Sequence, residues 1–410
     1  MTQLKLGAVG VGSLLVSASY GVAFLLGSGE MAVHAGMAGS LYAIVTALGM
    51  LALAAPTLWR TRELIWDVFG DRYGTVVRKL VALLSLVWMS GVLAAQIHGG
   101  IAVLVAMGLP AMPALAVIAA GLLIMSSLEL GMAATVFVIS LLVTNIALVH
   151  ALVASNGLPV YLHAWPSFAS EVRGTPRAET LVTIAAVGFL VITGSDYQQF
   201  VIAARRPRDA WLGCVLAGLF LTATGFLPAA AVVAALHAGR LSGLHDSASA
   251  IPSLILQTGG PLGPLCIGVI LLAALGSGSA LTRAMACALE GVVKGGGHRA
   301  HYRRILIIAI GSAIAADGQA IVSTIVSLNV VYVAAVGLLF ILHETGLKVP
   351  PRCATMMLLA GAGVSLLVAA IHWTGIFDVA GWLPLPAGLL ASSCMLLTWQ
   401  IMFGIRRVRA

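Results

Sequence analysis

Two stretches of the chain place a glycine, a serine and a carboxylate inside long apolar runs. The first lies between Ser17 and Glu30, and the second between Ile192 and Asp196. Backbone freed from a helix at membrane depth is tolerated only where it lines a cavity or is buried in protein. Two glycine-interrupted hydrophobic segments in corresponding halves are typical of a solute site, although small residues also permit close helix packing. The solute-binding positions predicted at the two breaks are Ser19, Tyr20, Gly21, Gly194 and Ser195.

The two carboxylates lie toward the far ends of their apolar runs. A carboxylate inside a bilayer is costly and usually marks an ion or proton pathway. Glu30 is therefore predicted to hold an amine or a proton at an outer vestibule. Asp196 is predicted to keep an inner gate closed by pairing with a cation. The alternative is that both acids sit at the water interface.

Arg283 and Glu290 are seven residues apart in one apolar run, so they share a face of a helix. An arginine within a span is expected to face protein or water, because facing lipid is expensive. Its candidate partners are Asp196 and Glu290. We interpret these residues as a cytoplasmic gate network, with a static ion pair as the equal alternative.

Gln96 and His98 are polar residues within the apolar run VLAAQIHGGIAVL. They are two apart, so they cannot both face one cavity squarely. Both remain candidate solute-binding residues, and His98 would also offer a route for protons. A histidine that only packs between helices is the competing interpretation.

The composition requires a polytopic membrane protein. Hydrophobic residues make up 60% of the chain and charged residues 9%, with a mean hydropathy of +1.06; soluble domains carry about 25% charged residues. A span needs roughly 20 apolar residues. The predicted fold is all-α, with about twelve spans near residues 7–30, 37–58, 80–108, 111–128, 131–155, 180–203, 210–238, 263–293, 304–319, 321–343, 354–374 and 383–404.

The basic residues lie mostly in the loops on one side of the predicted membrane. With both termini in the cytoplasm of a cell (inner) membrane, only Arg173, Arg177 and Arg240 fall in outer loops, as the positive-inside rule requires. The net charge of +8 is therefore no indication of nucleic acid. The five cysteines are scattered without a CxxC pair, which indicates neither disulfides nor a metal site.

The topology predicts a single membrane domain over residues 1–410 with an internal repeat. Spans one and six run in opposite directions, and both contain a break and an acid. Five spans over about 7–155 would be repeated, inverted, over about 180–343, with two additional helices over about 354–404.

Four stretches resemble the sodium:solute symporter family, within the amino acid–polyamine–cation superfamily of LeuT-type fold. They are SASYGVAFLLGSGEMAVHAGMAGSLYA from Ser17, LWRTRELIWDVFGDRYG from Leu58, TGSDYQQFVIAARRPRDA from Thr193 and LLAALGSGSALTRAMACALEGVVKG from Leu271. The resemblance covers about residues 10–300. It implies a 5+5 inverted repeat with broken helices 1 and 6, and a sodium or proton gradient that drives uptake of small organic solutes.

The resemblance also implies where a coupling ion would bind. Carbonyls at Ala18 and Gly21 match the family's sodium site in the first helix, and Ala274 and Ser277 match it in the eighth. The family has two adjacent hydroxyl residues there, whereas this chain has Ser277 next to Gly276 and Gly278. Sodium coupling would therefore depend on a weaker site or on water.

The resulting prediction is cation-coupled symport, with Na⁺ or H⁺, of a small organic solute such as an amino acid or amine. The alternative is a transporter-like membrane sensor without coupled uptake. An intramembrane enzyme is not expected, because the sequence contains neither HExxH nor GxSxG. The expected partners are a small-molecule solute and the lipid bilayer, without nucleic acid and without a cofactor beyond the coupling ion.

Overall fold

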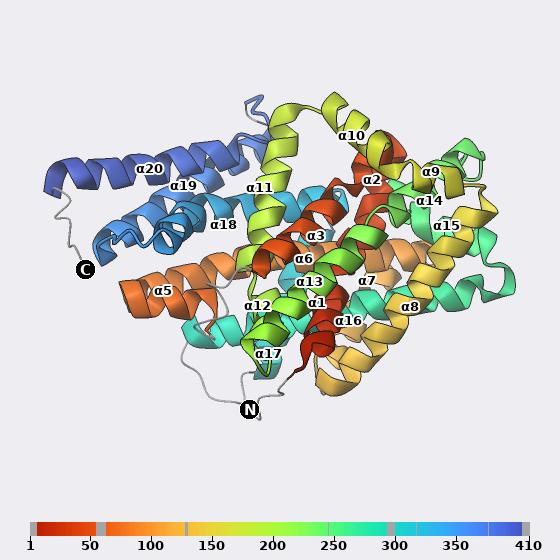
Figure 1. Ribbon diagram of the computed structural model, residues 1–410, viewed down its shortest axis with the longest axis horizontal. Coiled ribbons are helices and arrows are strands. Elements are labelled where there is room, and N and C mark those ends of the chain that lie inside the picture. The colour runs from red at the N-terminus through yellow and green to blue at the C-terminus, as the bar shows by residue number, and fades with distance from the viewer. Residues whose placement is uncertain are drawn as a thin grey trace.

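The computed structural model describes residues 6–54, 63–127, 130–244, 246–292, 300–316, 318–375 and 377–403, with the backbone alone for 130–138, 291 and 300. Every element in these ranges is a helix (Figure 1). The start of the second family-like stretch, at 58–62, and the basic residues near both chain ends lie outside the described residues.

Helical segments, singly or in groups of two or three, occupy all twelve predicted spans. Eight helical segments are long and apolar enough to cross a membrane, and α1, α7 and Ile139–Ala154 of α8 are shorter apolar helices. This confirms the predicted all-α membrane fold. The spans are formed by α1 (Ala8–Ser19) with η1 (Ala23–Gly27) and α2 (Ser28–Ala35); η2 (Gly36–Ser40) with α3 (Leu41–Leu53); α6 (Thr75–Ala106); α7 (Ala111–Met125); α8 (Leu130–Ala154); α11 (Arg177–Thr193) with α12 (Ser195–Ile202); α13 (Pro207–Thr224) with α14 (Leu227–His237); α16 (Gly263–Val292); α17 (Ala300–Ala315); α18 (Ile321–Glu344); α19 (Pro351–Thr374); and α20 (Pro384–Phe403).

Short helices form the longer connections. They are α5 (Ile65–Tyr73), α9 (Leu158–Leu162), α10 (Ala164–Gly174) and α15 (Ala250–Thr258). In α5, Ile65 and Phe69 are buried on one face, while Asp71 on the opposite face is exposed. That pattern is typical of a helix lying against the body of a protein.

The spans pack as two groups. In one, α1 contacts α13, α13 contacts α3, and α3 contacts α11; in the other, α6 is surrounded by α7, α16, α17 and α18. Small residues permit the close approach of the helices. A Cβ atom on Gly213 of α13 would lie 2.6 Å from Val11 of α1, and one on Gly218 would lie 2.6 Å from Leu51 of α3.

Both predicted helix breaks are present. Helix α1 ends at Ser19, a turn follows at Tyr20 and Gly21, and residues 23–27 form a single π-helical stretch before α2. Helix α11 ends at Thr193, and Gly194 leaves the helical region with φ −65° and ψ 122° before α12 begins. The glycine–serine interruptions therefore divide spans one and six.

The chain start is joined to the end of α12. The Leu6 amide donates to the Ala203 carbonyl at 3.0 Å, and the Arg205 amide donates to the Leu6 carbonyl at 2.8 Å. This pair of bonds forms an isolated bridge between Leu6 and Ala204. The segment that leads into α1 is therefore hydrogen-bonded to the segment that follows α12.

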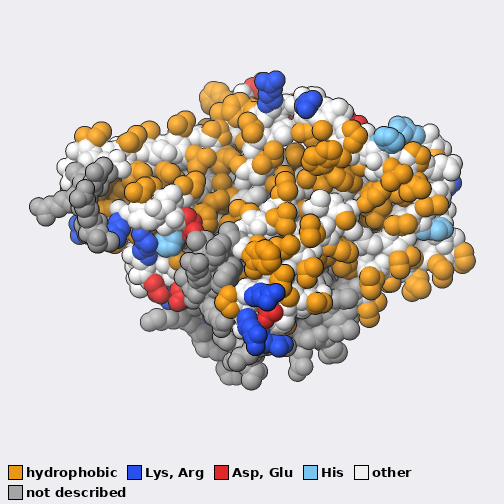
Figure 2. Space-filling view, viewed as in Figure 1, with side chains coloured by type: hydrophobic (Ala, Val, Ile, Leu, Met, Phe, Trp, Pro, Cys, Tyr) orange, Lys and Arg blue, Asp and Glu red, His pale blue; other side chains and the backbone are white. Residues whose placement is uncertain are grey.

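The outer surface is apolar over most of the face shown in Figure 2, with charged side chains in small separate groups. Exposed apolar residues recur at helical spacing along α8, at Leu142, Ile146, Val149 and Val153. Such a stripe would be costly in water and suits contact with lipid.

Candidate functional site

A narrow cavity lies between the two helix breaks, and we call it the central cavity. Its volume is about 40 Å³. Helices α1 and α12 line it together with α3, α6, α11 and α16. Its polar lining residues are Ser17, Ser19, Gln96, Asp196, Gln199 and Ser277.

Gln96 of α6 connects the break in span one to the rest of the protein. Its Oε1 accepts a hydrogen bond from the Val22 amide at 3.1 Å. Val22 follows the turn, so its amide is one of those that a new helical segment leaves without an internal partner. A Cβ atom on Gly21 would lie 2.6 Å from Gln96 Nε2 and 3.0 Å from Ser277 Oγ. Gly21 thus allows the turn to approach α6 and α16 closely.

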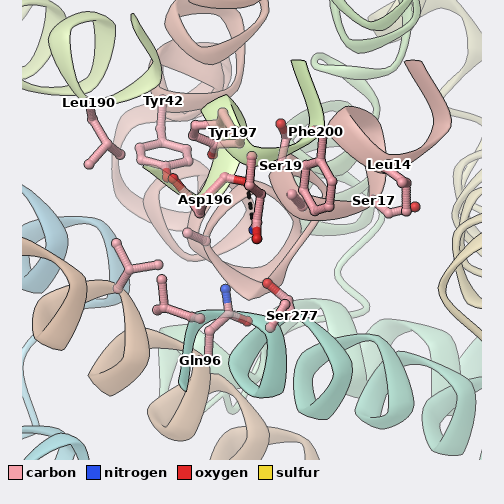
Figure 3. Close-up of a pocket in the computed structure, with 16 residues that line it drawn as sticks. Leu14, Ser17, Ser19, Tyr42, Gln96, Leu190, Asp196, Tyr197, Phe200 and Ser277 are labelled. Carbon is pink, nitrogen blue, oxygen red and sulfur yellow. Dashed lines mark hydrogen bonds between the residues drawn. The ribbon is translucent and has the colours of Figure 1, made fainter. Parts of the chain in front are cut away.

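Asp196 lines the central cavity from the first turn of α12. Figure 3 shows it with Tyr42 and Tyr197 on one side, and Gln96 and Ser277 on the other. Its Oδ1 atom is buried and accepts no hydrogen bond from the described residues. The Gln199 amide donates instead to the Asp196 main-chain carbonyl, at 2.9 Å. The carboxylate therefore has an unused acceptor at the break of span six.

Two residues of the predicted gate network, Glu290 and Arg283 of α16, contact side chains or backbone of two other helices. Glu290 pairs with Arg303 of α17 at 2.7 Å. Arg283 donates to the Met125 carbonyl at 3.2 Å and to Ser279 Oγ at 3.5 Å. Met125 ends α7, and a cation is favourable at a helix C-terminus. Glu290 is thus paired with a cation of α17, and the gate roles of Asp196, Arg283 and Glu290 stay predictions.

Glu30 lies away from the central cavity. It is 5% exposed, and its Oε2 accepts from the Ile321 amide at 2.8 Å. Ile321 is the first residue of α18, so the carboxylate satisfies a free amide and lies at the favourable end of the helix dipole. Glu30 is therefore buried against the N-terminus of α18, and its role in holding an amine or a proton at an outer vestibule stays a prediction.

The other predicted solute-binding residues divide into two sets. Ser19 and Gln96 line the central cavity, whereas half-buried His98 does not. The Tyr20 hydroxyl donates to Asn145 Oδ1 of α8 at 2.7 Å. Gly194 forms the break itself, and Ser195 Oγ lies 3.8 Å from the Met89 sulfur. Their roles in binding stay predictions.

A second, smaller space of about 10 Å³ adjoins the break in span one, and we call it the small cavity. Two of its lining hydroxyls, of Ser17 and Thr144, are buried and have no hydrogen-bond partner among the described residues. Of the four predicted ion-binding positions, Gly21 and Ala274 line the small cavity, and Ala18 and Ser277 line the central cavity.

Thr144 was not singled out from the sequence. A hydroxyl in a membrane helix usually bonds to its own backbone four residues earlier, as Thr46 and Thr222 do here. Only the position of α8 beside the turn at Tyr20 and Gly21 distinguishes Thr144 from them. Its neighbour Asn145 forms the hydrogen bond between helices, by accepting from the Tyr20 hydroxyl.

No protein-family model matches the sequence, and neither does any curated protein. Solved structures do match. A Na⁺-coupled sialic acid symporter in a substrate-bound outward-open state superposes with a TM-score of 0.72 at 14% identity, covering 98% of this chain and 90% of that one. A nucleobase-cation-symport-1 family transporter, in a closed conformation with bromovinylhydantoin bound, gives 0.51 at 15% identity and covers 96% and 91%. The chain therefore has the fold of these membrane symporters, with the broken first and sixth helices predicted from its sequence.

Proposed function

We propose that the protein is a secondary active transporter that carries a small organic solute by cation-coupled symport, through alternating access. The central cavity supports this most directly. It lies where α1 and α11 both end, and α12 continues from it on the far side of the second break. Discontinuous helices around a buried site are the usual construction of a transporter that rocks around its solute.

In this proposal the solute contacts α1, α6 and α12. Ser19 and Gln96 supply hydroxyl and amide groups, and Asp196 supplies a charge. The rings of Tyr42, Tyr197 and Phe200 supply apolar contact from the same cavity. A few convergent polar groups in a mostly apolar pocket are typical of small-molecule sites.

We place the coupling ion near Ala18, Gly21, Ala274 and Ser277. A hard cation such as Na⁺ needs several oxygen ligands. In α16, Ser277 lies between Gly276 and Gly278, so neither neighbouring residue offers a second hydroxyl oxygen to the ion. The unpartnered hydroxyls of Ser17 and Thr144 supply oxygens on the α1 and α8 side of the same region. In this proposal these two oxygens replace the second hydroxyl ligand that α16 does not provide. Proton coupling is the alternative within this proposal.

We further propose a location in the cell (inner) membrane with both termini in the cytoplasm. The distribution of basic residues supports this orientation, since only Arg173, Arg177 and Arg240 lie in outer loops.

Reconstitution into liposomes tests the proposal. We would record currents on a solid-supported membrane while applying amino acids, amines, nucleobases and carboxylates, under an inward Na⁺ gradient, an inward proton gradient or neither. The expected result is a current that needs one solute class together with one gradient. A solute that stabilises the purified protein without producing flux would favour the sensor interpretation, because stabilisation requires only binding to the folded state.

A further inference from the structure

We propose that the transported solute carries a positive charge, an ammonium group, and that Asp196 is the residue that selects it. This inference rests on the proposed transport function and narrows its substrate class.

The first argument is the charge of the central cavity. Asp196 is the one charged side chain among the described residues that line it. Its Oδ1 is buried and has no hydrogen-bond partner there, although the backbone amides of Asp196 and Tyr197 at the start of α12 also act on the carboxylate. A buried carboxylate is costly unless a counter-charge or hydrogen-bond donors compensate it. An ammonium group supplies both, since it carries three N–H donors and one positive charge.

The second argument is the rest of the lining. The rings of Tyr42, Tyr197 and Phe200 face the same space, and aromatic faces attract cations. No lysine or arginine among the described lining residues is available to pair with a carboxylate of the solute. A zwitterion or an anion would therefore leave its own negative charge uncompensated beside Asp196.

The third argument comes from a neighbouring cavity of about 500 Å³, which we call the inner-mouth cavity. Among the described residues that line it, three carboxylates, of Glu63, Asp67 and Asp71, accompany one arginine, Arg78, which is paired with Asp67. Gln199 lines both this cavity and the central cavity, so the two spaces adjoin. The described lining of this cavity therefore carries more negative than positive charge, which favours a cation over an anion there.

The size of the central cavity sets a limit on the solute. A cavity needs about 10–15 Å³ on this measure to hold one water, and the central cavity offers about 40 Å³. The conformation seen here thus encloses only a few heavy atoms. Small alkylammonium compounds are the appropriate probes.

The test compares four probes of similar size and different charge on the full-length protein: n-propylammonium, 1-propanol, propanoate and glycine. Thermal stabilisation of the purified protein reports binding, and currents from proteoliposomes report transport. We expect n-propylammonium to stabilise most. In Asp196→Asn its apparent affinity should fall at least about 30-fold, as when one partner of a buried charge pair is removed.

Two further variants control this experiment. Glu179→Gln neutralises an exposed carboxylate at the other end of the same span and should leave the order of the probes unchanged. Asp196→Glu keeps the charge and should retain the preference for ammonium with reduced affinity. It remains informative if Asp196→Asn does not fold.

Several results would overturn the inference. If a neutral or anionic probe, or glycine, binds as well as n-propylammonium and is carried, the charge assignment is wrong while the transport function stands. If Asp196→Asn alters only the Na⁺ response or only the melting temperature, Asp196 serves the ion or the N-terminus of α12. If no solute in this or the wider panel binds or produces current, the transport proposal fails as well.

Discussion

At the scale of single residues, the carboxylate of Glu30 is a helix cap that comes from 291 positions earlier in the chain. Glu30→Gln keeps an acceptor for the Ile321 amide but removes the charge from the α18 N-terminus. We expect a loss of about 1 kcal/mol in unfolding free energy, from the helix dipole and the weaker hydrogen bond. Unfolding in mixed micelles measures it, with Asp378→Asn, at an exposed position outside the helices, as the control. An unchanged stability with abolished transport would instead return Glu30 to the solute pathway.

The proposed role of the Thr144 hydroxyl as an ion ligand leads to a separate prediction about ion coupling. Thr144→Val should weaken the apparent Na⁺ affinity roughly tenfold, because a hard-cation site loses one oxygen ligand. Thr222→Val is the matched control, since that hydroxyl only bonds to the Gly218 carbonyl of its own helix. Currents recorded across a Na⁺ titration measure the effect. Equal responses of the two variants would remove Thr144 from the ion site.

At the scale of the elements, the second half of span one depends on a contact with α6. A Cβ atom on Gly99 would lie 1.8 Å from Val22 Cγ1, just after the break. Gly99→Ala should therefore destabilise the protein by about 1–3 kcal/mol, as overpacking does. Gly363→Ala, at a helical glycine with open space, should be neutral or stabilising by up to about 1 kcal/mol. Unfolding experiments that found equal effects would contradict close packing at the break.

Helix α5 depends on α12 through one side chain. Gln198 accepts from the Ile65 amide at 3.1 Å and donates to the Ile192 carbonyl at 3.4 Å. Gln198→Leu should raise hydrogen exchange in Ile65–Tyr73, because the Ile65 amide loses its acceptor. If exchange there is the same as in the unsubstituted protein, packing alone positions α5.

At the scale of the whole molecule, the proposed orientation can be tested from both sides of the membrane. Ser242→Cys and Arg206→Cys place thiols at exposed positions, in a background where exposed Cys287 and Cys394 are replaced by serine. A membrane-impermeant maleimide should label position 242 in intact cells and position 206 only after permeabilisation. The reverse pattern would invert the topology.

The sequence predicted the parts of this fold that depend on composition along the chain. Apolar length located the spans, and glycine with serine located the breaks, because both are local properties. The partners of Glu30, Glu290 and Arg283 were not predictable in the same way. Each is set by the packing of separate helices, and several acceptable partners lay within reach on sequence grounds.

The lining of the cavities was only partly predictable for a related reason. Successive residues of a helix point about 100° apart, so neighbours face different spaces. Ser19 faces the central cavity, while Tyr20 and Gly21 face the small cavity. Thr144 could not be found without knowing that α8 lies beside the turn.

The bridge between Leu6 and Ala204 would couple the movements of α1 and α12 during the proposed inward opening. Helix α1 follows directly from Leu6, and α12 ends just before Ala203, so two backbone hydrogen bonds join the two half-helices that meet at the central cavity. While these two hydrogen bonds are intact, α1 and α12 cannot move independently of each other at that end. A conformer with only one of them displaced would break both bonds. Under the proposed alternating access we therefore expect inner access to be one cooperative step, so that rates measured at the two half-helices agree.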